Sequence, residues 1–388
     1  MRRSKPFIIA ILFIQLISSG KAKAMTSPHF LSFSTLYFLN IENNAEINGA
    51  LEDRNKNILL YGSSSNLHNS VNTSIPSYSS VRDSMVFMLS QDGSLQWLTI
   101  NGTNNVKDYC EYIGGAIFPQ TIVLCQRILY EDSWDERFRI IILNNQGKVS
   151  KEIPLPNNFI VRKTTSTDRY LLLSGFQLDE THRTPCLYAV NENGDISWAY
   201  KEEPFKWSDE QKHIHSFKNI EANPQGSIAL QLDHGNGKRF LLLLNENGEL
   251  LQKYHIDNLN PIRIWITENA LGAVGYKQNT SFICISFAFT STSSKTLNIP
   301  LSSRLSLPKG FCGNTEVYHL CEDVNIPTAI WVYSPEQNKM ESITLSSLPD
   351  GFVADGFLLL SSHQYLIWGH LLSLETLSNE ALLLILSK

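Results

Sequence analysis

Short apolar runs recur along this chain at nearly regular intervals, and each run leads into a polar turn that contains a glycine. Four of these turns align on Gly93, Gly147, Gly194 and Gly248, which are separated by 54, 47 and 54 residues. The four residues that begin seven positions before each glycine read Val-Phe-Met-Leu, Ile-Ile-Ile-Leu, Leu-Tyr-Ala-Val and Leu-Leu-Leu-Leu. Such a run predicts a strand that is covered on both faces.

The segment after each apolar run predicts a β-hairpin. Polar residues precede the glycine, and in three of the four turns Asn-Gly or Asp-Gly supplies the positive φ of a tight turn. An aliphatic residue follows two positions after the glycine, so we expect the next strand to alternate between a buried and a wet face. Another apolar strand precedes each hairpin, and fainter copies continue to the C-terminus. The repeat is therefore an antiparallel sheet unit of roughly fifty residues.

This repeat predicts an all-β fold, a β-propeller of seven four-stranded blades. The last unit stops after its third strand, while an unpaired apolar strand at residues 35–39 precedes the first unit. If this N-terminal strand becomes the outer strand of the last blade, the ring closes and leaves no open sheet edge. Six or eight blades, an open solenoid and two β-sandwiches are the alternatives. A solenoid usually has shorter repeats and does not explain the complementary missing strands.

Two tryptophans, Trp97 and Trp198, stand four positions after the turn glycine. The repeat unit consists of a strand, the turn Asn-x-x-Gly, an aliphatic residue and then Trp. It resembles the bacterial propeller repeats grouped with quinoprotein-like and outer-membrane assembly-type propellers. The resemblance covers residues 25–388 as architecture. Quinoprotein dehydrogenases carry a fuller tryptophan-docking motif in nearly every blade, whereas only these two tryptophans match it here. The resemblance therefore does not imply a calcium and quinone site, and we expect no cofactor.

Residues 1–24 have the pattern of a secretory signal peptide. Arg2, Arg3 and Lys5 precede an apolar run at residues 7–17, and a small-x-small cleavage site lies at residues 22–24. The apolar run is too short to cross a bilayer, and no later stretch is long and apolar enough.

We therefore predict an exported protein, periplasmic or extracellular, with no transmembrane segment in the mature chain. Residues 25–388 are expected to form a single propeller domain and a monomer. The polar residues 63–80 are expected to be a mobile insertion in the first blade.

The net charge indicates which partners to expect, and the cysteine content indicates whether disulfides can form. The formal net charge is −5, so a nucleic-acid partner is not expected. Six cysteines in an exported chain permit disulfides. Cys312 and Cys321 flank a short polar segment and are candidates to bridge a hairpin, and Cys110 is a candidate to bridge Cys125 if their strands pair. Buried free thiols are the alternative for Cys125.

The innermost strands of a propeller are where we expect an axial ligand site. His213 and His215 are two residues apart, which places them on one face of a predicted innermost strand, where they could bind zinc or act as acid and base. No third metal ligand can be assigned. Arg162, with Lys163 beside it, and Arg263 lie on the neighbouring innermost strands. Their charge predicts a positive channel mouth that binds an anionic glycan or small molecule.

Trp134 and Trp207 lie in polar segments, where each is either a partner anchor or folds back onto its own blade. The sequence lacks a nucleophile elbow, a phosphate-binding glycine loop and a His-Glu-x-x-His motif. The first functional hypothesis is therefore a non-catalytic scaffold that binds a protein partner through loops of one face, or a ligand. The alternative is an exported hydrolase or lyase that acts on a glycan or peptide, with His213 and His215 near the axis.

Overall fold

The computed structural model describes most of the chain and contains strands and turns but no helix among the residues that it describes. These residues are 32–38, 45–65, 82–103, 108–130, 133, 135–206, 215–234, 238–256, 259–277, 281–291, 293–299, 309–312, 316–323, 326–345, 352–362, 364–372 and 379–387. Residues 1–24, Trp134, Trp207 and His213 lie outside these ranges, so the predictions on them stay predictions.

The strands follow one another as four-stranded antiparallel meanders. Two meanders are joined into one eight-stranded sheet by a single bridge between Arg82 and Tyr109. Their strands are β2 (Glu46–Glu52), β3 (Ile58–Ser65), β4 (Arg82–Leu89) and β5 (Leu95–Asn101), then β6 (Tyr109–Ile117), β7 (Thr121–Leu129), β8 (Glu136–Asn144) and β9 (Val149–Pro154).

The following sheets repeat this order. The third contains β10 (Phe159–Ser166), β11 (Leu171–Leu178), β12 (His182–Val190) and β13 (Ile196–Lys201), with the short β14 (Phe205–Lys206) paired to β12. The fourth contains β15 (Ser216–Ala222), β16 (Ile228–Asp233), β17 (Arg239–Leu244) and β18 (Leu250–His255). The fifth contains β19 (Leu259–Ile266), β20 (Ala270–Lys277), β21 (Ser281–Ala288) and β22 (Ser294–Ile299).

The two remaining sheets bring the ends of the chain together. One contains β23 (Lys309–Cys312), β24 (Val317–Asp323), β25 (Ile326–Ser334) and β26 (Lys339–Thr344). The other has the order β27 (Phe352–Leu359), β28 (Tyr365–Leu372), β29 (Asn379–Ser387) and β1 (Ser32–Phe38). The N-terminal strand therefore pairs with the C-terminal strand, with Leu36 opposite Leu384.

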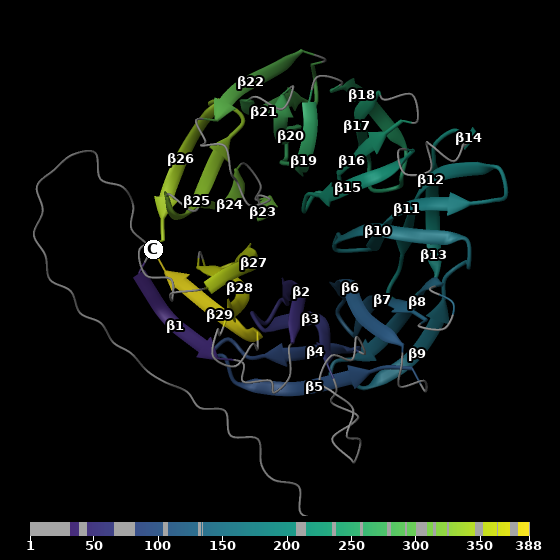
Figure 1. Ribbon diagram of the computed structural model, residues 1–388, viewed down its shortest axis with the longest axis vertical. Helices are drawn as coiled ribbons and strands as arrows, with labels where there is room; N and C mark the ends of the chain where they lie inside the picture. The colour runs from purple at the N-terminus through teal and green to yellow at the C-terminus, as the bar shows by residue number, and fades with distance from the viewer. Residues whose placement is uncertain are drawn as a thin grey trace, which may run out of the picture.

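The sheets stand around an open centre, with the first strand of each meander innermost and the last at the rim (Figure 1). This arrangement is a β-propeller, so the predicted all-β propeller fold is confirmed. Apolar side chains fill the space between neighbouring sheets. Leu60 and Phe87, for example, lie in one buried cluster with Leu366 and Trp368, which joins the first sheet to the last along the chain.

The turn glycines behave as the sequence predicts. Gly93, Gly147, Gly194 and Gly248 have φ values of 81°, 75°, 82° and 82°. The Trp97 ring lies against Gly147 in the next sheet, and its Nε1 donates a hydrogen bond to the Asn145 carbonyl oxygen at 3.1 Å. These contacts dock one sheet onto the turn of its neighbour.

Three of the aliphatic residues two positions after the turn glycines are exposed. We expected these strands to alternate between a buried and a wet face, and Leu95, Ile196 and Leu250 are on the wet side, at 43%, 42% and 42% exposed. The reason is that β5, β13 and β18 are rim strands, which have no further strand beyond them in their sheets.

A β-bulge recurs in six of the described innermost strands. The pairing of each strand with the next one along the chain shifts at its third, fourth or fifth residue. One extra residue is inserted there and has no partner on the neighbouring strand. The inserted residues are Asn48, Ile113, Arg162, Lys218, Ile262 and Asp355. A bulge breaks the strict alternation of side chains, so successive residues can face the centre of the ring.

The register argues against both candidate disulfides. Strands β6 and β7 do pair, but Cys110 lies opposite Ile128 and Cys125 opposite Gly114, and both thiols are free and buried. Cys312 lies opposite Val317, four residues before Cys321. At about 3.3 Å per residue these two Cα atoms are roughly 13 Å apart along the strand, beyond the ~7 Å limit of a disulfide.

Two predicted boundaries also move. The N-terminal strand was expected at residues 35–39 and is observed at Ser32–Phe38. The predicted insertion at residues 63–80 starts too early, because β3 continues to Ser65 and both Ser63 and Ser64 are fully buried. The rest of that segment lies outside the described residues.

Candidate functional site

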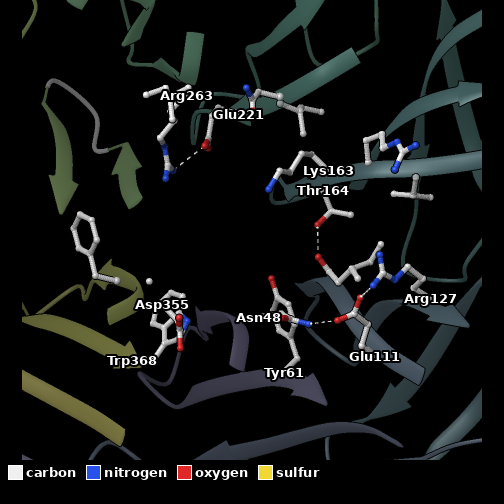
Figure 2. A pocket seen from close by; sticks show the side chains of 18 residues that line it. Asn48, Tyr61, Glu111, Arg127, Lys163, Thr164, Glu221, Arg263, Asp355 and Trp368 are labelled. Atoms are coloured by element: carbon white, nitrogen blue, oxygen red, sulfur yellow. Dashed lines mark hydrogen bonds and ion pairs between the residues drawn. The ribbon is translucent and has the colours of Figure 1, made fainter. Parts of the chain in front are cut away.

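A cavity of about 610 Å³ lies at the centre of the ring. The innermost strands β2, β6, β10, β15, β19 and β27 contribute to its wall, with further side chains from β3, β7 and β28 (Figure 2). Polar and charged side chains dominate the lining. They are Asn48, Tyr61, Glu111, Arg127, Arg162, Lys163, Thr164, Asn219, Glu221, Arg263 and Asp355.

The cavity carries an excess of positive charge although the whole chain is acidic. Four of its lining residues are cationic and three are carboxylates, which leaves one cation in excess, whereas the formal net charge of the chain is −5. Both Arg162 and Lys163 reach the cavity although they are adjacent in sequence, because the bulge of β10 lies between Val161 and Lys163.

One side of the cavity is held by a hydrogen-bond network around Glu111. This residue lies opposite Arg127 on the paired strands β6 and β7, and the two form a salt bridge of 2.6 Å. Asn48 Nδ2 and the Tyr109 hydroxyl donate to Glu111 Oε2 at 3.0 and 3.1 Å. The charge of Glu111 is therefore compensated within the protein, and the network joins the first two sheets.

The opposite side contains a second ion pair, which joins the fourth and fifth sheets. Arg263 Nη2 donates to Glu221 Oε1 at 2.8 Å. Burial raises the pKa of Glu221, whereas Arg263 and Lys163 act to lower it. The Nε–H of Arg263 is buried and has no acceptor.

Lys163 is a cavity cation that lacks a direct hydrogen bond or ion pair among the described residues. Its side chain is exposed to the cavity. Figure 2 shows its side chain extending toward the open space between Arg263 and Asn48. An ammonium group in this position attracts anions that enter the cavity.

The structure brings together some of the predicted site residues and separates others. Arg162 and Arg263 both line the cavity, as expected from their innermost strands. His215 does not line it. It precedes β15, which begins at Ser216, so it is not on the innermost strand to which the sequence assigned it. Sequence reasoning missed Glu111 and Arg127, because nothing in their local pattern marks a residue that faces the axis.

His215 is instead packed between rings near the third and fourth sheets. It is 1% exposed, and its ring lies 5.1 Å from Phe205 and 4.8 Å from His234. Its Nε2 donates to the Glu203 carbonyl oxygen at 3.1 Å. Burial lowers the pKa of His215 to about 4, and His234 and Arg183 act in the same direction. His215 is therefore neutral at physiological pH.

This pKa predicts a loss of stability in weak acid. The neutral ring is favoured in the folded state, so its contribution is complete above the unfolded pKa of about 6.5 and is lost as the pH falls toward 4. The total loss is about 3 kcal/mol. Urea unfolding of wild type and His215→Gln between pH 7 and pH 4 should show a shallower pH dependence for the variant. The exposed His182→Gln is the control, and equal slopes for all three proteins would contradict the prediction.

The described residues contain no group of three His, Cys, Asp or Glu side chains placed to hold a metal ion. They also include no helix with the length and apolarity needed to cross a membrane.

No family model and no curated protein matches the sequence. Solved structures do match it. The polysaccharide lyase Uly1 aligns with a TM-score of 0.57 and 9% identity over 95% of this chain and 94% of the other. The β-propeller domain of the Trilobed protease from Pyrococcus furiosus aligns with a TM-score of 0.53 and 8% identity over 88% and 93%.

The acylaminoacyl peptidase of Pyrococcus horikoshii also aligns, with a TM-score of 0.53 and 10% identity over 87% of this chain. The chain covers only 51% of that peptidase. At such low identity these similarities establish the β-propeller fold and nothing about activity. They do not support a quinoprotein-like or an outer-membrane assembly-type relationship in particular.

Proposed function

We propose that this protein is an exported, non-catalytic binding propeller whose central cavity holds an anionic ligand. The observation that carries the proposal is Lys163, an ammonium group that faces a cavity whose four cations outnumber its three carboxylates. The buried Nε–H groups of Arg127 and Arg263, on opposite sides of the cavity, also lack acceptors. A carboxylate or sulfate on a glycan, or a small anionic molecule, fits this chemistry.

The cavity is built to hold a ligand without changing shape. Its ion pairs, Glu111–Arg127 and Glu221–Arg263, use side chains that are fixed on paired or neighbouring strands. Rigid donors lose little conformational entropy on binding, which favours affinity. A protein partner that contacts loops of one face, with Trp134 and Trp207 as its anchors, belongs to the same proposal.

We propose further that the ring consists of seven blades and that β1 completes the last of them. Support comes from the pairing of β1 with β29 and from the buried cluster between the first and last sheets. A closed ring keeps the six lining strands at fixed distances from one another, which the cavity requires.

An exported hydrolase or lyase acting on a glycan or peptide is the second candidate, and one observation favours it. Glu221 lies in the cavity with a pKa raised by burial, which suits a proton-accepting or proton-donating group. The histidine originally expected in this role, His215, is buried away from the cavity. Turnover of a glycan that is lost in Glu221→Gln, with binding retained, would favour this candidate.

The binding proposal predicts selectivity for charge on the ligand. Isothermal titration should detect a uronic-acid oligosaccharide and give no heat with its carboxyl-reduced counterpart. Lys163→Met should weaken binding of the acidic oligosaccharide about tenfold or more, because a charge-assisted hydrogen bond is worth roughly 1.5–3 kcal/mol.

Lys151→Met is the matched control, because Lys151 lies on β9 at the rim and bonds the Asn193 carbonyl oxygen rather than facing the cavity. Its affinity should equal that of wild type. Equal binding of the acidic and the reduced oligosaccharide, or unchanged affinity in Lys163→Met, would refute the proposal.

A further inference from the structure

Two arginines contact the same aromatic ring beside the cavity. Arg183 of β12 lies 3.4 Å from the centroid of Phe176, and Arg162 of β10 lies 5.2 Å from it. Arg183 is only 3% exposed, whereas Arg162 is exposed and also lines the central cavity. The guanidinium groups of both arginines therefore lie close to Phe176, in the third sheet.

Among the residues that the structure describes, no carboxylate pairs with the buried Arg183. It forms no ion pair and no hydrogen bond with the residues that the structure describes, and its Nε–H is buried without an acceptor. Burial, with a smaller contribution from Arg162, lowers its pKa to about 10, so the group is still charged at neutral pH. Contact with an aromatic face compensates only part of the cost of burying a charge.

A third cation lies close to this pair. Lys218 is the inserted residue in the bulge of β15, the same position that Arg162 has in β10. Strands β12 and β15 pack against each other. Burial lowers the pKa of Lys218, and Arg183 and Arg162 lower it further, while Asp233 opposes them. Asp233 also forms a salt bridge with Arg239 at 3.7 Å, so its single charge is shared.

We propose that Arg183, Arg162 and Lys218 form an oxyanion subsite between the third and fourth sheets, beside the central cavity. Arg183 and Arg162 contact the same ring there, Lys218 is coupled electrostatically to both, and the Nε–H of the almost fully buried Arg183 lacks an acceptor. The group that fits is a tetrahedral or planar oxyanion, namely phosphate, sulfate or carboxylate. The subsite shares Arg162 with the central cavity, but its other two residues, Arg183 and Lys218, do not line that cavity.

Titration of the full chain with inorganic phosphate, sulfate and acetate, at constant ionic strength with chloride, tests the subsite. At least one of the three anions should bind with 1:1 stoichiometry at this position. Arg183→Met should weaken that binding about tenfold or more, since it removes the buried charged donor. Lys163→Met should leave it unchanged, which separates this subsite from the proposed ligand site of the central cavity.

The stability of Arg183→Met in chloride gives an independent readout. Replacing a buried unpaired charge by an apolar side chain of similar length should leave Tm unchanged or raise it, because Met keeps the contact with Phe176. A structural role for the guanidinium would lower Tm instead. Arg169→Met is the control, since Arg169 is an exposed arginine whose side chain is 65% accessible and pairs with Glu246.

Crystals of the wild-type protein soaked in selenate locate the anion without any variant. Anomalous density beside the Arg183 guanidinium would support the proposal. Absence of density there, lack of binding by all three anions, anion binding that persists in Arg183→Met, or a lowered Tm of that variant in chloride would each overturn it.

Discussion

Prolines at Leu36 and Tyr37 together will lower the free energy of unfolding by about 5 kcal/mol and make the protein self-associate. Strand β1 pairs with β29 over six residue pairs, and two adjacent prolines remove a ladder hydrogen bond whichever of the two N–H groups faces β29. Residues 381–386 of β29 read Ala-Leu-Leu-Leu-Ile-Leu, so the loss of β1 exposes an apolar strand edge. Exposed apolar edges pair with other chains.

Calorimetry and sedimentation velocity measure both effects. We expect Tm to fall by roughly 6 °C and a concentration-dependent dimer or larger species to appear. Alanines at the same two positions are the control, because they keep the backbone ladder. If the alanine and proline variants lose equal stability, pairing of β1 with β29 contributes nothing, and the proposed closure of the ring is wrong.

Gly147→Ala has the second large expected effect, a loss of about 3 kcal/mol. The φ of 75° costs a side chain about 1 kcal/mol, and an added Cβ would overlap the six-membered ring of Trp97. Because the Trp97 indole is also anchored to the Asn145 carbonyl oxygen, the ring has to leave its place. Overpacking of this kind adds roughly 1–3 kcal/mol.

A double-mutant cycle with Trp97→Ala isolates the docking contact. In that background Gly147→Ala should cost only the strain of positive φ, which gives a coupling energy of about 2 kcal/mol. Gly194→Ala is the matched control. Its φ is 82°, but the added Cβ meets the terminal methyl of Ile153, which can rotate away. Equal losses for the two glycines, or additive losses in the cycle, would contradict the docking role.

The sequence predicted the repeating parts of the fold well because each depends on local chemistry. The positive φ of Gly93, Gly147, Gly194 and Gly248 follows from turn geometry, and the apolar runs before them form the middle strands β4, β8, β12 and β17. The last repeat unit lacks one strand, and an unpaired strand precedes the first unit. Together these two observations predicted the pairing of β1 with β29.

The candidate site was less predictable, because bulges and register decide which side chains reach the axis. The six inserted residues include an asparagine, two isoleucines, an arginine, a lysine and an aspartate, which share no chemical property. The Glu111–Arg127 pair depends on the register between β6 and β7, which the sequence does not reveal. His215 was predicted to lie on an innermost strand, but it precedes β15, which begins one residue later.

The pairing of β1 with β29 has a mechanical consequence. Ser32 lies opposite Ser387, whereas Phe38 lies opposite Leu382, so the two free ends of this strand pair are at the same end of the ladder. A force applied to both ends of the chain would therefore peel β1 from β29 one rung at a time instead of shearing all rungs together. Resistance to such a pull is limited to the strength of single rungs, and the outer strand of the last sheet is the first to detach.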